Sequence, residues 1–175
     1  MVVPVLAFLS ALVVASFFEY VVHRLMHRRW VLGQRHLQHH ANGWGQGVLG
    51  EFRDYLFGLP IVGWLGFLHS LQAGIAFAAG AVLYAFFAAY SHQLNHERPE
   101  LVFWLPRPVH YLHHAHKLWR HNFGIAVDVW DRVFGTYKPI EWRPERRAFD
   151  HPPRAFVQIA WGKYHPEEPG GEGRM

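Results

Sequence analysis

Two long apolar stretches restrict the possible folds of this chain more than any other feature of its sequence. The first, from Val2 to Phe18, carries no charge and is close to the length that a helix needs to cross a hydrocarbon core about 30 Å thick. The second lies between Asp54 and Glu97 and contains no Asp, Glu, Lys or Arg. A single helix of that length would overshoot the bilayer at about 1.5 Å per residue. We therefore expect a hairpin that folds back near His69 to Gly74.

The cations lie outside these stretches. All 17 Lys and Arg fall between Arg24 and Arg53 or from Arg98 onward, and the positive-inside rule then places both polar regions in the cytoplasm. We predict an all-α integral membrane domain over residues 1–140, with an N-terminal span, a membrane hairpin and histidine-rich helices on the cytosolic side. Residues 141–175, rich in Pro, Arg and Glu, are predicted to be a polar and partly disordered tail. The basic residues form no stripe interleaved with aromatics, which argues against a nucleic-acid partner.

The histidines point to a metal. The chain has no cysteine, so any metal must be held by nitrogen or oxygen. Ten of the 15 histidines form four boxes with the spacings HxxxH, HxxHH, HxxxH and HxxHH. On a helix, residues i and i+4 project from one face, and we expect HxxHH to add a third imidazole to the same site. The predicted ligands are His23, His27, His36, His39, His40, His92, His96, His110, His113 and His114.

The number of histidines indicates two ions. One ion rarely takes more than about six ligands, whereas two octahedral ions offer about twelve positions. Ten histidines would leave about two positions for water or O2, the open arrangement that catalysis requires. Imidazole suits Fe, Zn, Cu and Ni alike, so the ligand type does not choose the metal.

The order of the four boxes resembles that of the fatty acid hydroxylase and sterol desaturase superfamily. The stretch from His121 to Tyr137, HNFGIAVDVWDRVFGTY, is similar to the segment after the last box in many members. The resemblance implies a helical membrane protein that binds two iron ions at the ten histidines and uses O2 as co-substrate. It implies a lipid substrate, whether sterol, fatty acyl chain or carotenoid-like, and leaves hydroxylation and desaturation open. It also implies a separate ferredoxin- or cytochrome-like electron donor, since the chain has no flavin or nicotinamide fingerprint.

Other polar residues are candidates to support the ligands, because a metal-bound imidazole usually gives its second N–H to an acceptor. Asn122 and Asp131 lie in the family-like segment and are predicted to orient box histidines. His116 and His121 follow the last box but are not expected to bind the metal directly. The remaining nearby acids are Glu19, Glu51, Asp54, Glu97 and Asp128; for Glu51 and Asp54 we favour ordinary surface charges.

Two other classes of function remain open. A membrane metal transporter or metal store would also use histidines, but its ligands should lie within the spans, where only His69 is found. A two-zinc hydrolase would favour carboxylate-bridged ions and a positioned general base, and the boxes contain no clustered carboxylates.

Overall fold

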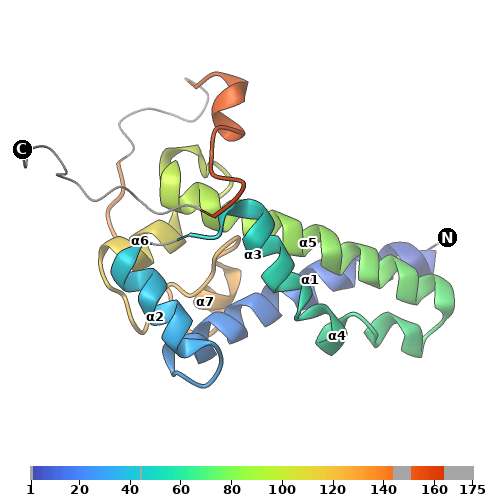
Figure 1. Ribbon diagram of the computed structural model, residues 1–175. Coiled ribbons are helices and arrows are strands. Elements are labelled where there is room, and N and C mark those ends of the chain that lie inside the picture. Colours follow the sequence, from blue (N-terminus) through green and yellow to red (C-terminus); the bar gives the residue numbers. More distant parts are fainter. Residues whose placement is uncertain (1, 44, 144–150, 164–175) are drawn as a thin grey trace, which may run out of the picture.

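The computed structural model describes residues 2–43, 45–143 and 151–163, and these contain helices and no strand. Two long helices lie side by side and run in the same direction, with the shorter elements gathered at one end and along one flank (Figure 1). The elements are α1 (Val2–His27), α2 (Gly33–Asn42), α3 (Gly47–Leu56), α4 (Leu59–Val62), η1 (Leu65–Leu68), α5 (Leu71–Glu97), η2 (Pro99–Leu101), α6 (Val109–Ala115), α7 (Val129–Val133) and η4 (Pro153–Phe156).

Small residues allow α1 and α5 to pack closely. Ala11 on α1 and Ala81 on α5 are buried in one apolar cluster. A Cβ atom at Gly80 would lie 2.6 Å from the carbonyl oxygen of Phe8, so the two backbones can approach only because position 80 has no side chain. Because the two helices run in the same direction, their C-terminal ends lie together (Figure 1). The first and third histidine boxes occupy those ends.

Only α1 and α5 are long and apolar enough to be candidate membrane spans among the described residues. The predicted reversal is confirmed at His69 and Ser70, where the Ser70 hydroxyl accepts a hydrogen bond from the Ala73 amide and caps α5. The segment before this reversal is not one continuous spanning helix. It consists of α3, α4 and η1. Gly58, Pro60 and Gly63 lie in this segment, and proline and glycine disfavour a continuous helix.

Part of the predicted tail packs against the helices. Ala155 and Ile159 are buried with Val48, and the Ala160 amide donates to the Glu97 carboxylate at 3.0 Å. Glu97 therefore has a structural role, because its carboxylate holds the segment around Ala160 against the helices. The other tail residues, 144–150 and 164–175, lie outside the described residues, and the domain boundary at residue 140 stays a prediction.

Candidate metal centre

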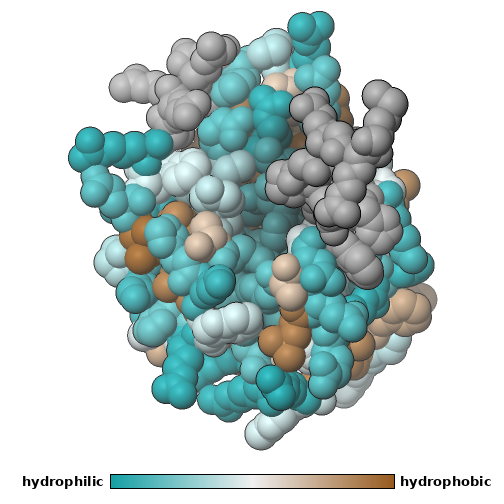
Figure 2. All heavy atoms as spheres, turned by 60° about the vertical axis from the view of Figure 1, so that its left-hand side comes forward, coloured by the Kyte–Doolittle hydropathy of each residue, from teal (hydrophilic) through white to brown (hydrophobic). Residues whose placement is uncertain are grey.

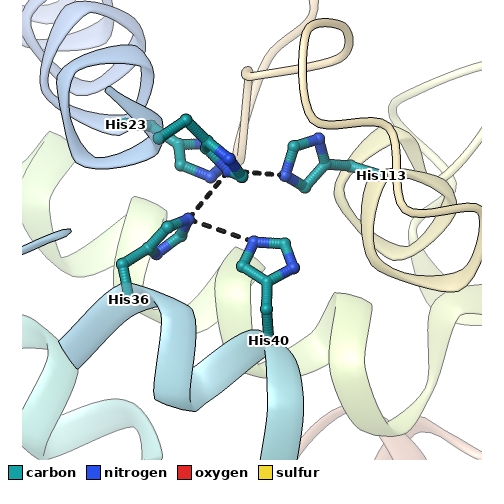
Figure 3. A group of neighbouring side chains, drawn as sticks. His23, His36, His40 and His113 are labelled. Atoms are coloured by element: carbon teal, nitrogen blue, oxygen red, sulfur yellow. Dashed lines mark hydrogen bonds between the residues drawn. The ribbon is translucent and has the colours of Figure 1, made fainter. Parts of the chain in front are cut away.

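Helices α1, α2, α5 and α6 each contribute one histidine box to the same end of the molecule. The two long helices supply HxxxH in their last two turns, while the short helices α2 and α6 supply HxxHH. Figure 3 shows His23 from α1, His36 and His40 from α2 and His113 from α6 pointing toward one another. The boxes are distant in sequence, yet they form one continuous cluster of imidazoles.

Nine of the ten box histidines form two groups, and within each group the candidate ligand atoms all lie within 4.8 Å of one another. The first histidine group is His23, His27, His36, His40 and His113. The second histidine group is His39, His96, His110 and His114. The two groups adjoin, since the rings of His40 and His114 stack with centroids 3.8 Å apart.

Within each group the Nε2 atoms converge. The Nε2 atom of His27 lies 2.8 Å from that of His36 and 2.9 Å from that of His113. In the second group, Nε2 of His96 lies 3.1 Å from that of His39 and 3.2 Å from that of His110. Metals bind the unprotonated imidazole nitrogen, so this arrangement suits one ion in each group.

Two buried nitrogens support the same interpretation. The Nε2 atoms of His23 and His114 are buried and have no hydrogen-bond partner among the described residues. A buried polar atom without a partner is costly, and a metal ion would satisfy it. One such Nε2 atom belongs to each group, so the donor set fits two ions.

The HxxHH boxes do not give three ligands to one group, contrary to the expectation from sequence. At about 100° per residue, position i+4 lies about 40° from i, whereas i+3 lies about 60° away on the opposite side. His36 and His40 therefore join the first group, while His39 joins the second. In the last box the pattern is reversed, with His110 and His114 in the second group and His113 in the first.

His92 is the one box histidine outside both groups. Its ring lies beside the second group, with its centroid 4.7 Å from those of His96 and His110. Its Nδ1 atom is 3.6 Å from a carboxylate oxygen of Glu51. Glu51 on α3 therefore faces the cluster, and the interpretation of Glu51 as an ordinary surface charge is wrong. Asp54 instead pairs with Arg35 and Arg53, as a surface charge would.

Backbone carbonyls fix two rings of the first group. The Nδ1 atom of His23 lies 2.5 Å from the Phe123 carbonyl oxygen, and Nδ1 of His113 lies 2.7 Å from the His121 carbonyl oxygen. A carbonyl oxygen can only accept, so each Nδ1 carries the proton and each Nε2 is free to bind a metal. Both acceptors belong to one short loop after the last box.

Two buried carboxylates hold this loop. Asp131 accepts from the amides of Phe123 and Gly124 at 2.9 and 2.7 Å. Glu19 accepts from the Ile125 amide at 2.7 Å and from the Tyr84 hydroxyl at 2.9 Å. Burial raises the pKa of the Asp131 carboxyl. The carboxylates thus act on the imidazoles through the backbone and not by direct contact.

Asn122 has a related structural role. Its backbone is left-handed, with φ of 58°, and its side chain forms two hydrogen bonds with the backbone of Lys138, at 2.7 and 3.0 Å. These bonds fix the chain between the two acceptor carbonyls. His116 and His121 do not belong to either group, and Asp128 pairs with Arg132 at 2.6 Å.

Burial keeps five of the imidazoles of α2 and α6 neutral. It lowers the pKa of His36 and of His40 to about 2 and that of His113 to about 4, and neighbouring imidazoles add to the effect at His36 and His40. The pKa values of His110 and His114 also lie well below the ordinary value for the same causes. Neutral imidazole is the form that binds metals.

Figure 2 looks onto this end of the molecule, and most of the face is hydrophilic and hollowed near its middle. The polar end contrasts with the apolar surface of α1, where Val2, Val5, Leu6, Leu9 and Val13 are exposed. The candidate centre thus lies at the polar end of two apolar helices, near the expected boundary between membrane and water.

The comparison with known families agrees with this geometry. A model of the family described as fatty acid hydroxylase matches residues 8–136, which include all four boxes and the loop that supports them. This chain belongs to the fatty acid hydroxylase family. Neither the curated proteins nor the solved structures that were compared gave a match.

Membership of the fatty acid hydroxylase family indicates an oxygenase-type enzyme that hydroxylates or desaturates a lipid. The family and the two apolar helices together indicate a membrane protein. The family is known for its use of iron, and the two histidine groups are able to hold metal. The resemblance inferred from the boxes is therefore confirmed at the level of the family.

Proposed function

We propose that this chain is a non-haem di-iron oxidoreductase that uses O2 to hydroxylate or desaturate a C–H bond of a sterol, fatty acyl or carotenoid-like lipid. The observation that carries the proposal is the division of nine box histidines into two adjoining groups at the end of two apolar helices. A site built for one ion would not need two groups. Its position beside the apolar helices suits a substrate that arrives from the bilayer.

The first histidine group would hold one iron and the second would hold the other. His92 is the proposed tenth ligand, because it lies against the second group and completes five histidines on each side. The choice of iron rests on the family, since imidazole also accepts Zn, Cu and Ni. When bound, iron would supply the reductive activation of O2 that oxidation of an unactivated C–H bond requires.

The protein's own residues would orient and insulate the centre. The carbonyls of His121 and Phe123 hold the Nδ1 protons of two ligands, and Asp131 and Glu19 hold the loop that carries those carbonyls. Asn122 and Asp131 are thus proposed as positioning residues. Burial of His23, His110 and His113 limits the access of bulk water to their rings.

A separate electron donor follows from the balance of the reaction. Hydroxylation places one oxygen atom of O2 in the lipid and the other in water, which consumes two electrons and two protons. The exposed ring of Trp119 lies against the rings of His40 and His27, with centroids 5.1 and 5.5 Å apart. No acidic residue occurs from Tyr20 to Gly50 or from Leu101 to Val127. These two segments carry cations without acids, which suits an acidic ferredoxin- or cytochrome-like carrier.

The histidine end is proposed to face the cytoplasm. Arg24, Arg28 and Arg29 follow the apolar part of α1, and Arg98 follows α5, as the positive-inside rule requires of cytoplasmic ends. Metal transport is the alternative function. The only histidine in the apolar region between α3 and the box of α5 is His69, which is exposed at the turn before α5, so no series of ligands crosses the bilayer through the described helices.

The test is lipid analysis of membranes from cells that express the protein under ¹⁸O2. Hydroxylation would give a lipid with one ¹⁸O, whereas desaturation would give a lipid that has lost two hydrogens and contains no ¹⁸O. The product should be absent with His113→Ala and present with His116→Ala, the control just beyond the last box. Product formation that survives His113→Ala would overturn the proposal.

A further inference from the structure

A hollow of about 270 Å³ lies on the side of α1, close to the histidine end but outside both histidine groups. Its aromatic floor is formed by Phe17, Tyr20 and Phe134. The ring of Phe134 stacks on that of Tyr20 with centroids 5.5 Å apart and lies 5.9 Å from that of Phe17. Val21 and Leu25 complete the apolar lining. The hollow therefore offers an apolar surface to whatever surrounds α1.

Two arginines line the same hollow. Arg24 lies in the last turn of α1, and Arg28, four residues later, directly follows the C-terminal residue of the helix. Arg24 is held in place, because its guanidinium donates to the Tyr20 hydroxyl at 3.2 Å and lies 6.0 Å from the centroid of the Phe123 ring. Neither arginine forms an ion pair with a carboxylate among the described residues, in a part of the sequence that has no acid from Tyr20 to Gly50. Two positive charges thus border an apolar hollow without a counter-charge from the part of the chain that the structure describes.

The position of the hollow along α1 suggests what balances these charges. The charge-free part of α1 ends at Phe18, and Arg24 lies six residues further on, or about 9 Å along the helix. Phe17 and Phe134 are 38% and 48% exposed, which suits contact with lipid tails better than contact with water. The hollow therefore extends along α1 from the expected edge of the hydrocarbon core toward the expected level of the lipid headgroups.

We propose that this hollow binds an anionic phospholipid of the surrounding membrane. Its phosphate lies between the guanidinium groups of Arg24 and Arg28, since guanidinium forms charge-assisted hydrogen bonds with phosphate oxygens. One acyl chain packs on Phe17, Val21 and Phe134. The site uses no metal ligand, so the proposal does not depend on the chemistry of the histidine groups.

The bound lipid would support the loop behind the centre. The Tyr20 hydroxyl at the floor of the hollow lies 3.0 Å from the Thr136 hydroxyl, and the Thr136 hydroxyl donates to Asp131 at 2.6 Å. Asp131 in turn holds the amides of Phe123 and Gly124. A lipid on this floor therefore contacts the residue that begins a chain of hydrogen bonds to the acceptor loop.

Native mass spectrometry of the full-length protein in detergent tests the proposal, with palmitoyl-oleoyl phosphatidylglycerol as the probe and the matching phosphatidylcholine as the neutral comparison. The wild type should retain one phosphatidylglycerol in preference to phosphatidylcholine. The double variant Arg24→Gln, Arg28→Gln should weaken that binding about tenfold or more. The matched control, Arg29→Gln with Arg120→Gln, removes the same charge from exposed positions outside the hollow and should retain the lipid.

A second variant keeps both arginines and fills the hollow. Val21→Trp should lower retention of phosphatidylglycerol by obstructing the acyl chain, with an unchanged circular dichroism spectrum as the check on folding. Equal losses in the two arginine double variants would mean non-specific surface attraction and would overturn the proposal. Competition by inorganic phosphate alone, or displacement by oleate at equal concentration, would also overturn it in favour of a simple anion site or a fatty acid site.

Discussion

The two histidine groups use the same box spacings but are supported in different ways. In the first group, His23 and His113 contact carbonyl oxygens of a loop that Asp131 and Glu19 hold. Beside the second group, the Glu51 carboxylate lies 3.6 Å from His92, a histidine that adjoins the group without belonging to it. Backbone acceptors fix ring orientation through the fold itself, whereas a single side chain can rotate. The comparison indicates a rigid first site and a more adaptable second site.

Loss of the Asp131 carboxylate should have the largest effect on this difference. Asp131 is fully buried and accepts hydrogen bonds from two amides and the Thr136 hydroxyl. Asp131→Ala should destabilise the protein by about 3 kcal/mol or more, because it leaves buried donors without partners. It should also remove iron from the first group before the second. Thermal unfolding and iron content would measure both effects, and a variant that keeps full iron would contradict the role of the loop.

Acid should weaken metal binding in both groups. In the first group, the pKa values of three histidines indicate the pH range. Burial lowers the pKa values of His36 and His40 to about 2 and that of His113 to about 4, from an ordinary value near 6.5. A depressed folded-state pKa contributes stability that is present above the unfolded pKa and lost as the pH falls toward the folded one. The metal-free protein should therefore lose stability progressively below about pH 6.5, and iron should be released in the same range. Stability that stays constant from pH 7 to 4 would contradict neutral, buried imidazoles.

Glu51→Gln tests the second group. The substitution keeps the shape of the side chain but removes the carboxyl group near His92, and loss of such a supporting partner commonly costs 10- to 100-fold in metal affinity. We expect a weakening of about tenfold that is confined to one of the two irons, measured by competition with a chelator. Asp54→Asn is the matched control, since Asp54 pairs with surface arginines. Equal weakening of both irons would show that the groups are not supported independently.

Asn122→Gly should have the smallest effect. Glycine suits the left-handed backbone at this position but loses both side-chain hydrogen bonds to Lys138. The easier left-handed backbone stabilises the variant, whereas the loss of two hydrogen bonds destabilises it. We expect a net destabilisation of about 1 kcal/mol with both irons retained. Chemical denaturation would measure it. Complete loss of iron would mean that Asn122 acts on the centre directly and not through the loop.

Much of this arrangement could be predicted from the sequence, because it depends on side-chain types at helical spacing. Short sequence patterns are enough to predict the ten histidine ligands, the two long apolar helices and the reversal near His69. The division of each HxxHH box between two groups was missed because i+3 and i+4 were treated as one face. The angle between these positions on a helix, about 100°, was the available signal.

Other features depend on tertiary contacts, which cannot be predicted from a short stretch of sequence. The acceptors for His23 and His113 are backbone carbonyls, which every residue has, so no residue type identifies them. Glu51 reaches His92 only because α3 packs along α5. The short helices before α5 reflect the glycines and the proline of that segment, whose apolar composition alone suggested a longer helix.

The most direct test of the account is metal content together with Mössbauer spectroscopy of detergent-purified protein expressed with ⁵⁷Fe. His113→Ala with His114→Ala removes one ligand from each group, and His116→Ala is the control. The account predicts about two coupled irons per chain in the wild type and in the control, and their loss in the double variant. One iron or none under iron-replete conditions, or two irons that survive the double variant, would contradict it.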